Sequence, residues 1–403
     1  MNKKIVLLTV NGGSSSIKCA AYSRGPGLSL KRLFLARIER IGQGGSSFSV
    51  FEGIETNCQT GKSRAENPAE AEDELLNWLE KRLGFHRVLA IGHRIVQGLH
   101  HKVTTLIDEA LLRELSRYYS YDPDHLPGEL ALIQAFSRKF PGVQQVACFD
   151  TAFHADLPRV AQLLAIPRRF DDAGIRRYGF HGLSYTYLME QLALVAGPSL
   201  AGGRIILAHL GSGSSITAVL GGKSMDTSMG FTPAGGVPMS TRSGDLDPGV
   251  AWYMMEKDQL SPEQFNHLIN QECGLKGISA LSSDMQDLLQ LEDHHTSAAE
   301  AIAFYCYQVK KFIGAYAAVL GGLDALVFTG GIGEHAASIR SRICAGLDHL
   351  GLILDERRNK TSQNLLSAPG NPVSIYVFPT DEEQVIARST ARLLDLHPLK
   401  AKK

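Results

Sequence analysis

The sequence predicts an α/β fold built from two duplicated domains, and three observations support this. The chain has 403 residues, more than one hydrophobic core usually serves. Apolar strand-like runs alternate with amphipathic helical patterns, as in α/β proteins. An apolar strand, a Gly/Ser turn and a second strand occur near Gly12 and again near Gly211, about half the chain apart. Such a long period favours duplicated domains over a solenoid, whose repeats span about 20 to 50 residues.

The chain begins with two expected strands, at residues 3–10 and 17–22. The Gly/Ser turn of NGGSSSIK joins them, and this punctuation indicates an antiparallel hairpin. Residues 42–67 are rich in Gly, Ser and Asn and are expected to form strands and loops.

A helix is expected next, because Asn67-Pro68 combines an N-cap with proline at the first helical position. Its apolar face contains Leu75, Leu76, Leu79 and Leu83. The segment RVLAIGHRIV then predicts a strand.

Two aspartates mark the following elements. Asp108 is expected to cap a helix over EALLRELSRYY, and VQQVACFD predicts a buried strand that ends at Asp150. Strand and helix thus continue to alternate.

The second hairpin is RIILAHLGSGSSITAV, residues 204–219, in which Gly211 aligns with Gly12. Two related domains facing each other would direct both hairpins into one cleft. A third glycine-rich element, ALVFTGGIGEHAASIR, combines strand, glycine turn and helix, a junction suited to close approach of a nucleotide.

Composition narrows the class of partner. Lys and Arg number 41, as do Asp and Glu, so the chain lacks the excess charge expected of a general binder of nucleic acid or anionic membranes. The apolar run before NGGSSS is too short for a signal peptide core, and no apolar run reaches the roughly 18 to 20 residues that span a bilayer. We therefore expect a cytoplasmic protein with small-molecule partners.

NGGSSSIK offers consecutive backbone N–H groups, three hydroxyls and Lys18, which could together hold phosphate oxygens. Most single Gly/Ser hairpins are only turns, and the pattern is not the Walker motif. The second copy near Gly211 favours the phosphate interpretation.

Two arginines have unusual surroundings: Arg94 lies in the strand-like GHRIV and Arg242 in the loop TRSGDLDP. Such arginines suit bidentate binding of carboxylate or phosphate, although a buried ion pair would explain them equally. His181, in RRYGFHGLSY, could donate to a transferring phosphoryl group or be structural. The pair His294-His295 lies in an acidic segment and is expected on the surface.

Asp150 in FDTAFH and Glu382 in PTDEEQVIA follow apolar strands, where open α/β sheets bind their ligands. Asp150 could instead cap a helix. Either acid could hold Mg²⁺ through water, since Mg²⁺ keeps several waters and uses one or two carboxylates.

In this order the motifs resemble the acetate and propionate kinase family over nearly the whole chain. The motifs are NGGSSSIK, GHRIV, FDTAFH, RRYGFHGLSY, GKSMDTSMGFTP, TRSGDLDP, FTGGIGE and TDEE. The family belongs to the sugar kinase, Hsp70 and actin superfamily, so the resemblance implies two duplicated actin-like (ribonuclease H-like) domains around a nucleotide cleft. The implied boundaries are 1–150 for the first domain, with residues 385–403 packing back on it, and 151–384 for the nucleotide-binding domain.

The resemblance implies reversible, Mg²⁺-dependent (or Mn²⁺-dependent) phosphoryl transfer from ATP to acetate, giving acetyl phosphate and ADP. It also implies a homodimer. Alternatives are a propionate or short-chain acyl kinase, and the same fold with another phosphoryl donor such as pyrophosphate. A non-catalytic actin-like nucleotide-binding protein is disfavoured, since it needs no arginines and histidine for a second anion.

Family roles transfer to the matching residues of this sequence. The resemblance implies a catalytic set of Arg94, Asp150, His181 and Arg242. The acyl substrate would be bound by Arg94, Val96, Phe180 and Pro233. The metal ion would be held by Asn11 and Glu382, together with Asp150. Phosphate and nucleotide would be bound by Asn11, Ser14, Ser16, Lys18, His209, Gly211, Ser212, Gly213, Asp284, Gly330, Gly331, Ile332 and Gly333.

The sequence departs from the family pattern at five positions. On the nucleotide side Ser212 replaces a usual Asn and Gln286 a usual Arg. In the segment DPDHLP, Asp124 stands where a pocket leucine is expected, and it would repel a carboxylate substrate unless it points away or is paired. The other two changes are Gln97 for His and His335 for Asn.

Overall fold

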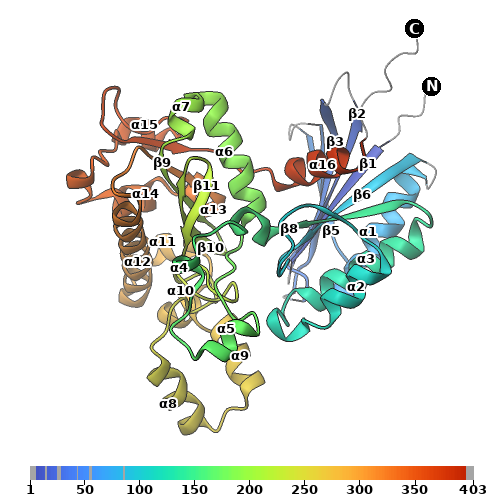
Figure 1. Cartoon of the computed structure of the whole chain (residues 1–403), viewed down its shortest axis with the longest axis horizontal. Coiled ribbons are helices and arrows are strands. Elements are labelled where there is room, and N and C mark those ends of the chain that lie inside the picture. Colours follow the sequence, from blue (N-terminus) through green and yellow to red (C-terminus); the bar gives the residue numbers. More distant parts are fainter. Residues whose placement is uncertain are drawn as a thin grey trace. The chain divides into compact units, whose positions relative to one another are not determined.

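The computed structural model describes residues 6–13, 16–24, 29–42, 44–53, 57–84 and 87–395. The chain divides into two compact units (Figure 1). The first contains the described residues up to Ala152 and those from Asp381 on, and the second is Phe153–Thr380. Each unit has its own sheet with helices against it, which confirms the α/β class.

The described part of the first unit forms an eight-stranded sheet in the order β5-β4-β3-β2-β1-β6-β8-β7. Neighbours from β1 to β5 are antiparallel, whereas β1, β6 and β8 run parallel. The strands are β1 (Val6–Gly12), β2 (Ser16–Arg24), β3 (Leu30–Glu39), β4 (Ser47–Glu52), β5 (Asn57–Lys62), β6 (Val88–Ile95), β7 (Thr105–Leu106) and β8 (Gln144–Phe149).

The predicted hairpin is confirmed: β1 pairs with β2 antiparallel, and Asn11 lies opposite Lys18. Alternate side chains of β1 enter two cores. Val6, Leu8 and Val10 pack on the side of α1 (Pro68–Leu83) and α3 (Leu126–Lys139), while Leu7 packs with α16 (Glu382–Leu393). The parallel part of the sheet therefore has helices on both faces, as Figure 1 shows for α3 and α16.

Both predicted helix caps of the first unit are present. Asn67 accepts a hydrogen bond from the backbone N–H of Glu70 at the start of α1, and Asp108 accepts from Leu111 at the start of α2 (Glu109–Ser116). The four leucines predicted to share a face of α1 are all buried. A 3₁₀ turn occupies Tyr119–Tyr121, and another follows β8 at Asp150–His154.

The second unit repeats the sheet of the first. Its order, β11-β10-β9-β12-β13, combines an antiparallel meander with two parallel strands, as β3-β2-β1-β6-β8 does. The hairpin β9–β10 thus corresponds to β1–β2, which confirms the predicted duplication. The strands are β9 (Arg204–Leu210), β10 (Ser214–Leu220), β11 (Lys223–Thr227), β12 (Ala325–Thr329) and β13 (Ser374–Val377).

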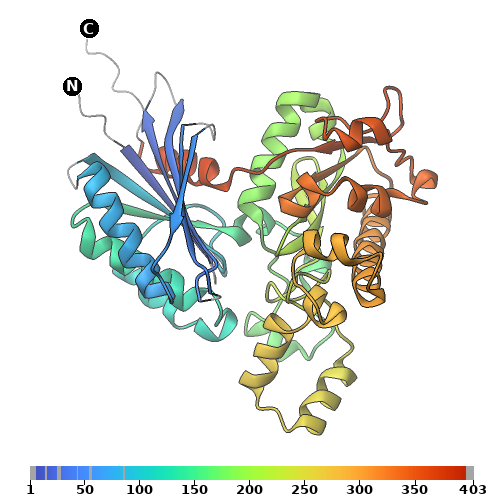
Figure 2. The ribbon, with the colours of Figure 1, turned by 180° about the vertical axis from the view of Figure 1, so that it is seen from behind.

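Helices also cover both faces of the second sheet, which Figure 2 shows from behind. Ile205 and Leu207 pack on α6, while Ile206 and Ala208 enter the core that contains α12. The helices are α4 (Arg159–Gln162), α5 (Arg168–Asp172), α6 (Gly182–Ala196), α7 (Pro198–Ala201), α8 (Pro248–Asp258), α9 (Pro262–Gln271), α10 (Gly274–Ser279), α11 (Met285–Leu291), α12 (Thr296–Leu320), α13 (Gly330–His335), α14 (Ala337–Cys344) and α15 (Glu356–Lys360), with a 3₁₀ turn at Asp348–Leu350.

None of the helices in the described part of the chain has the length and apolar character needed to cross a membrane.

Candidate active site

Arg94 is the centre of a charged cluster in the first unit. It lies near the carboxyl end of β6, beside the carboxyl ends of the parallel strands β1 and β8. Its Nε and Nη2 donate to Oδ2 of Asp150 at 3.0 and 2.5 Å, and its Nη1 donates to Oδ1 of Asn11 at 3.2 Å. Three parallel strands thus place three polar side chains at one edge of the sheet, as sequence reasoning expects of such ends.

Asp150 is completely buried and begins the 3₁₀ turn after β8. Its Oδ1 has no hydrogen-bond partner among the residues that the structure describes. Burial raises the pKa of Asp150, Arg94 lowers it, and Glu382 raises it again. Burial acts to lower the pKa of Arg94, but Asp150 and Glu382 outweigh it and raise that pKa, so the guanidinium keeps its charge.

Glu382 joins this cluster from the first turn of α16. Its Oε2 accepts from Nδ2 of Asn11 at 2.9 Å and lies 4.0 Å from Nε of Arg94. Glu383 also accepts from Nδ2 of Asn11, at 3.3 Å. Asn11 therefore links the cation of the cluster to two carboxylates.

The hairpin residues lie beside Asn11. Lys18 stands opposite Asn11 across the β1–β2 pair, so the two side chains share one face of the sheet. Ser16, two residues before Lys18 on the same strand, belongs to that face, and its backbone oxygen accepts from Gly13 at 2.8 Å. Ser14 lies outside the described residues.

Val96 follows β6 and is buried. Its backbone N–H donates to both carboxylate oxygens of Glu129, each at 3.1 Å. Burial raises the pKa of Glu129 well above its usual range, and Asp122 raises it further while Arg94 lowers it. Asp122 pairs with His125 at 2.7 Å. Asp124, by contrast, is exposed.

His181 organises the candidate site of the second unit. It precedes α6 with φ 59° and ψ 23°, a left-handed conformation that is uncommon for residues other than glycine. Its Nδ1 lies 2.9 Å from Oγ of Ser215, and its ring stacks on His209 at a centroid distance of 4.2 Å. His209 in turn contacts Ser184 through Nδ1 at 2.9 Å. The imidazole of His181 is therefore held from two sides.

Gly213 lies against both His181 and Arg242. A Cβ at Gly213 would lie 3.2 Å from Nε2 of His181 and 3.7 Å from Nη1 of Arg242. The backbone of the 239–242 loop is fixed by bonds such as Ser240 N–H to the oxygen of Ser212, at 3.2 Å. The second hairpin turn thus lies between the histidine and the arginine that the sequence singled out.

The same hairpin turn also meets the glycine turn at the start of α13. A Cβ at Gly211 would lie 3.6 Å from the backbone nitrogen of Gly331 and 3.9 Å from Nε2 of His209. Gly330 has φ 78°, and a Cβ there would lie 2.6 Å from the oxygen of Leu210. Ile332 and Gly333 are buried in α13, behind this contact, whereas Gly331 is exposed.

Phe180 and Pro233 belong to the same unit. Phe180 is buried, and its backbone oxygen lies 2.9 Å from Nε2 of His154. The backbone oxygen of Pro233 lies 3.4 Å from Nη1 of Arg242. Pro233 is thus next to the candidate catalytic arginine.

Asp284, predicted to bind the nucleotide, is the N-cap residue of α11. Its Oδ1 accepts from the backbone N–H of Gln286 at 2.7 Å and caps α11. Asp284, Gln286, Ser212 and His335 are all exposed.

Sequence reasoning missed four residues that hold these groups in place. Glu383 is adjacent to a residue that it named, and Ser215 lies in the second hairpin copy, so both carried a signal. Glu129 accepts a hydrogen bond from the backbone N–H of Val96, and Glu334 accepts one from that of Gly330 at 2.9 Å. Glu334 also carried a signal, since it ends the motif FTGGIGE, whereas Glu129 is visible only in the fold.

The chain matches the model of the family described as the acetokinase family over residues 6–388. An acetate kinase from Rhodopseudomonas palustris (strain TIE-1) is 41% identical over 395 residues, 97% of this chain and 98% of that protein. Crystal structures of a Porphyromonas gingivalis acetate kinase and a Francisella tularensis propionate kinase are each 33% identical, with TM-scores of 0.84 and 0.87. They cover 97% and 96% of this chain and 100% and 99% of their own. These structural matches confirm the duplicated actin-like fold, and the chain belongs to the acetokinase family.

Proposed function

We propose that the chain is an acetate kinase, which transfers the γ-phosphoryl group of ATP reversibly to acetate and forms acetyl phosphate and ADP. The acceptor is suggested by the names of its full-length relatives. The observation that best supports the reaction class is the buried cluster of Arg94, Asp150, Asn11 and Glu382 at the carboxyl ends of parallel strands. Open α/β sheets bind their ligands at such strand ends, where Arg94 and Lys18 offer cationic donors to an anion and the acids offer oxygen ligands to a divalent cation.

The reaction needs no protein nucleophile. A carboxylate oxygen of acetate forms a bond to the γ-phosphorus, the bond from that phosphorus to the β,γ-bridging oxygen breaks, and its electron pair leaves with ADP. Acetate is already ionised at neutral pH, so no proton transfer is required. Catalysis therefore rests on positioning and on charge neutralisation.

In this proposal Arg94 binds a carboxylate or phosphoryl oxygen. Asp150 positions its guanidinium by accepting from both Nε and Nη2, and Asn11 accepts from Nη1. Val96, the next residue but one, contributes an apolar contact to the acyl group.

His181 and Arg242 neutralise charge on the phosphoryl oxygens. Ser215 and His209 hold the imidazole of His181, so its Nε2 faces the turn at Gly213. Arg242 approaches the same turn. Donors oriented before the reaction stabilise developing charge without reorganising. The glycines at 211–213 and 330–333 would accept the nucleotide, because residues without side chains allow close approach.

The first unit also fits a magnesium ion. Asp150 has a buried carboxylate oxygen that meets no partner among the described residues, and Glu382 raises the pKa of Asp150, so these acids repel each other. Hard oxygen ligands of this kind suit Mg²⁺. We propose that Glu382, Asp150 and Asn11 hold it, directly or through water, where it would neutralise phosphate charge; Mn²⁺ could replace it.

The test is formation of acyl phosphate. The purified chain is incubated with acetate, ATP, Mg²⁺ and hydroxylamine, and acetohydroxamate is measured. The proposal predicts product that depends on acetate, ATP and Mg²⁺. No product from either acetate or propionate, with ATP or pyrophosphate, in a folded sample would contradict it. Product from pyrophosphate alone would keep the acceptor and replace the donor.

A propionate kinase is the second candidate. The propionate kinase structure is as similar in sequence to this chain as the acetate kinase structure, at 33% identity. One methylene in an apolar pocket changes binding by only about 1 to 3 kcal/mol. The ratio of kcat/KM for acetate and propionate decides between the two.

We also propose a cytoplasmic homodimer. Helix α8 buries none of its residues and exposes Val250, Trp252 and Tyr253, an apolar surface that a second copy could cover. Light scattering of the wild type and of Trp252→Glu tests this: a dimer is expected for the wild type and a monomer for the variant. A monomeric wild type would contradict the proposed assembly.

A further inference from the structure

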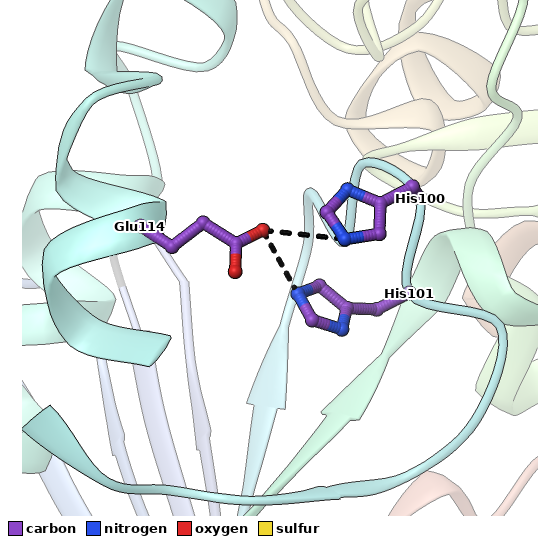
Figure 3. Close-up of side chains that lie close together, drawn as sticks. All are labelled: His100, His101 and Glu114. Atoms are coloured by element: carbon purple, nitrogen blue, oxygen red, sulfur yellow. Dashed lines mark hydrogen bonds and ion pairs between the residues drawn. The ribbon is translucent and has the colours of Figure 1, made fainter. Parts of the chain in front are cut away.

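We propose that His100, His101 and Glu114 bind a divalent transition-metal ion such as Zn²⁺ on the first unit, independently of the proposed kinase site. Nε2 of His100 and Nε2 of His101 lie 3.4 and 3.2 Å from the same oxygen, Oε1 of Glu114. One ligand atom of each residue lies within 4.8 Å of the others. Figure 3 shows both rings on one loop, turned toward the carboxylate that extends from α2.

The spacing fits a tetrahedral ion. Zinc binds nitrogen at about 2.0–2.1 Å and carboxylate oxygen at about 2.0–2.2 Å, so two ligand atoms on a tetrahedron lie about 3.3 Å apart. Both histidine–glutamate distances match this edge. The two imidazole rings stack at a centroid distance of 4.5 Å, so metal binding requires His100, whose side chain is 70% exposed, to rotate until its Nε2 faces the ion.

The loop holds these ligands by contacts that are already formed. Leu99 is buried with φ 55°, a strained conformation for leucine, and its N–H donates to Oε1 of Gln97 at 2.9 Å. The N–H of His101 donates to the oxygen of Gly98 at 2.8 Å, and its ring stacks on Phe149 at 5.0 Å. His101 is therefore fixed, and the turn at Leu99 places His100 beside it.

The donor set selects the class of ion. Two imidazole nitrogens and one carboxylate oxygen favour Zn²⁺, Co²⁺ or Ni²⁺ over Mg²⁺ and Ca²⁺, which prefer oxygen ligands. Three protein ligands leave a fourth position for water. The metal would tie the loop after β6 to α2, and that loop begins directly after Val96.

Hydrogen bonding offers a simpler explanation. Both imidazoles could donate to Oε1 of Glu114, and this would produce the same short distances without a metal. The two explanations differ in what Glu114→Gln does: the amide oxygen still accepts a hydrogen bond, but it is a poor ligand for a transition metal.

The experiment measures Zn²⁺ binding by calorimetry and Co²⁺ binding by visible absorption, at neutral pH, on the full chain without a histidine tag. The variants are His100→Ala and Glu114→Gln. His294→Ala is the matched control, because His294-His295 is also an adjacent, exposed histidine pair. Circular dichroism checks that each variant is folded.

We expect one ion per chain, tetrahedral Co²⁺ absorption, and affinity at least about tenfold lower in His100→Ala and Glu114→Gln but unchanged in His294→Ala. Zn²⁺ should also raise the Tm of the wild type and not of those two variants. The proposal is overturned if the wild type binds no Zn²⁺, if Glu114→Gln binds as tightly as the wild type, or if His294→Ala removes the site.

Discussion

Arg94 directs Nε and Nη2 at one oxygen of Asp150, 3.0 and 2.5 Å away, and the other oxygen of Asp150 is buried with no partner in the described part of the chain. A structural ion pair would gain by using both oxygens, since an unsatisfied buried polar group costs about 1–3 kcal/mol. The one-sided arrangement instead leaves an acceptor for a ligand.

Asp150→Asn should lower acetyl phosphate formation at least about a hundredfold. The amide carries no charge, so it neither positions the Arg94 guanidinium as strongly nor suits a metal ion. Stability should also fall, by about 3 kcal/mol, because Arg94 loses its buried partner. Turnover is measured by the hydroxamate assay and folding by urea denaturation.

Asp324→Asn is the matched control for that variant. Asp324 also binds one arginine through two nitrogens, with Arg204 Nη2 at 2.6 Å and Nε at 3.2 Å, but the pair is partly exposed at the start of β9. Turnover should stay near the wild-type value. Equal turnover in Asp150→Asn and Asp324→Asn would remove Asp150 from the proposed site.

Arg242→Ala should reduce kcat by roughly a hundredfold or more with little change in Tm. One charge-stabilising donor is worth about 2.7–4 kcal/mol of barrier. Arg242→Lys keeps the charge but loses the planar fork, so it should recover only part of the rate. Full activity of Arg242→Lys would indicate a simple electrostatic role, and full activity of Arg242→Ala would exclude the residue from the mechanism.

His181→Ala should have a similar effect on kcat. The fold should survive, because the contacts of the imidazole with Ser215 and His209 are made to side chains. Gly213→Ala is a second probe of the same group, since its methyl would lie 3.2 Å from Nε2 of His181. If His181→Ala retains wild-type kcat, the conformation at φ 59° has a structural cause only.

Sequence reasoning found the fold and most of the clusters because their signals are local. The β1–β2 and β9–β10 hairpins have Gly/Ser turns, and the caps at Asn67 and Asp108 act within three residues. It named Arg94, Asp150 and Glu382 as separate residues, but their contacts join β6, the turn after β8 and α16. Only the sheet topology brings those segments together.

The partners of buried polar groups are harder to predict from the sequence than the fold. Glu129 lies 33 residues from Val96 along the chain, in α3. Nothing in its own segment marks it as an acceptor of the Val96 N–H. The cluster of His100, His101 and Glu114 is equally hidden in the sequence, because β7 separates the two adjacent histidines from Glu114 along the chain. Asp124 is a different case: its place in the sequence predicts conflict with a substrate carboxylate, and the structure shows its side chain exposed.

Two buried histidines should make stability depend on pH. Burial lowers the pKa of His93 and of His154 to about 4 each. In the unfolded chain histidine titrates near about 6.5, so between these values the unfolded state binds more protons and stability falls as pH falls. The loss should begin near pH 6.5 and be complete near pH 4, on the order of 3 kcal/mol for each histidine.

Urea denaturation between pH 4 and 7.5 measures this slope. His93→Gln should reduce the slope of unfolding free energy against pH by the equivalent of up to about one bound proton. His349→Gln, which removes an exposed imidazole, should leave the slope unchanged. An unchanged slope in His93→Gln would show that His93 titrates alike in the folded and unfolded states.

Two adjacent glycines at the start of α13, Gly330 and Gly331, allow folding and nucleotide binding to be tested by separate substitutions. Gly330→Ala should destabilise the protein by about 1–3 kcal/mol, because φ is 78° and the new Cβ would lie 2.6 Å from the oxygen of Leu210. Gly331→Ala should leave Tm unchanged, since a Cβ there meets no atom within 4 Å. If this turn accepts ATP, the methyl at Gly331 occupies the space that the nucleotide needs, and the KM for ATP should rise at least about tenfold while the KM for acetate changes little. An unchanged KM for ATP would place the nucleotide elsewhere and leave the Gly330 result as a property of the fold alone.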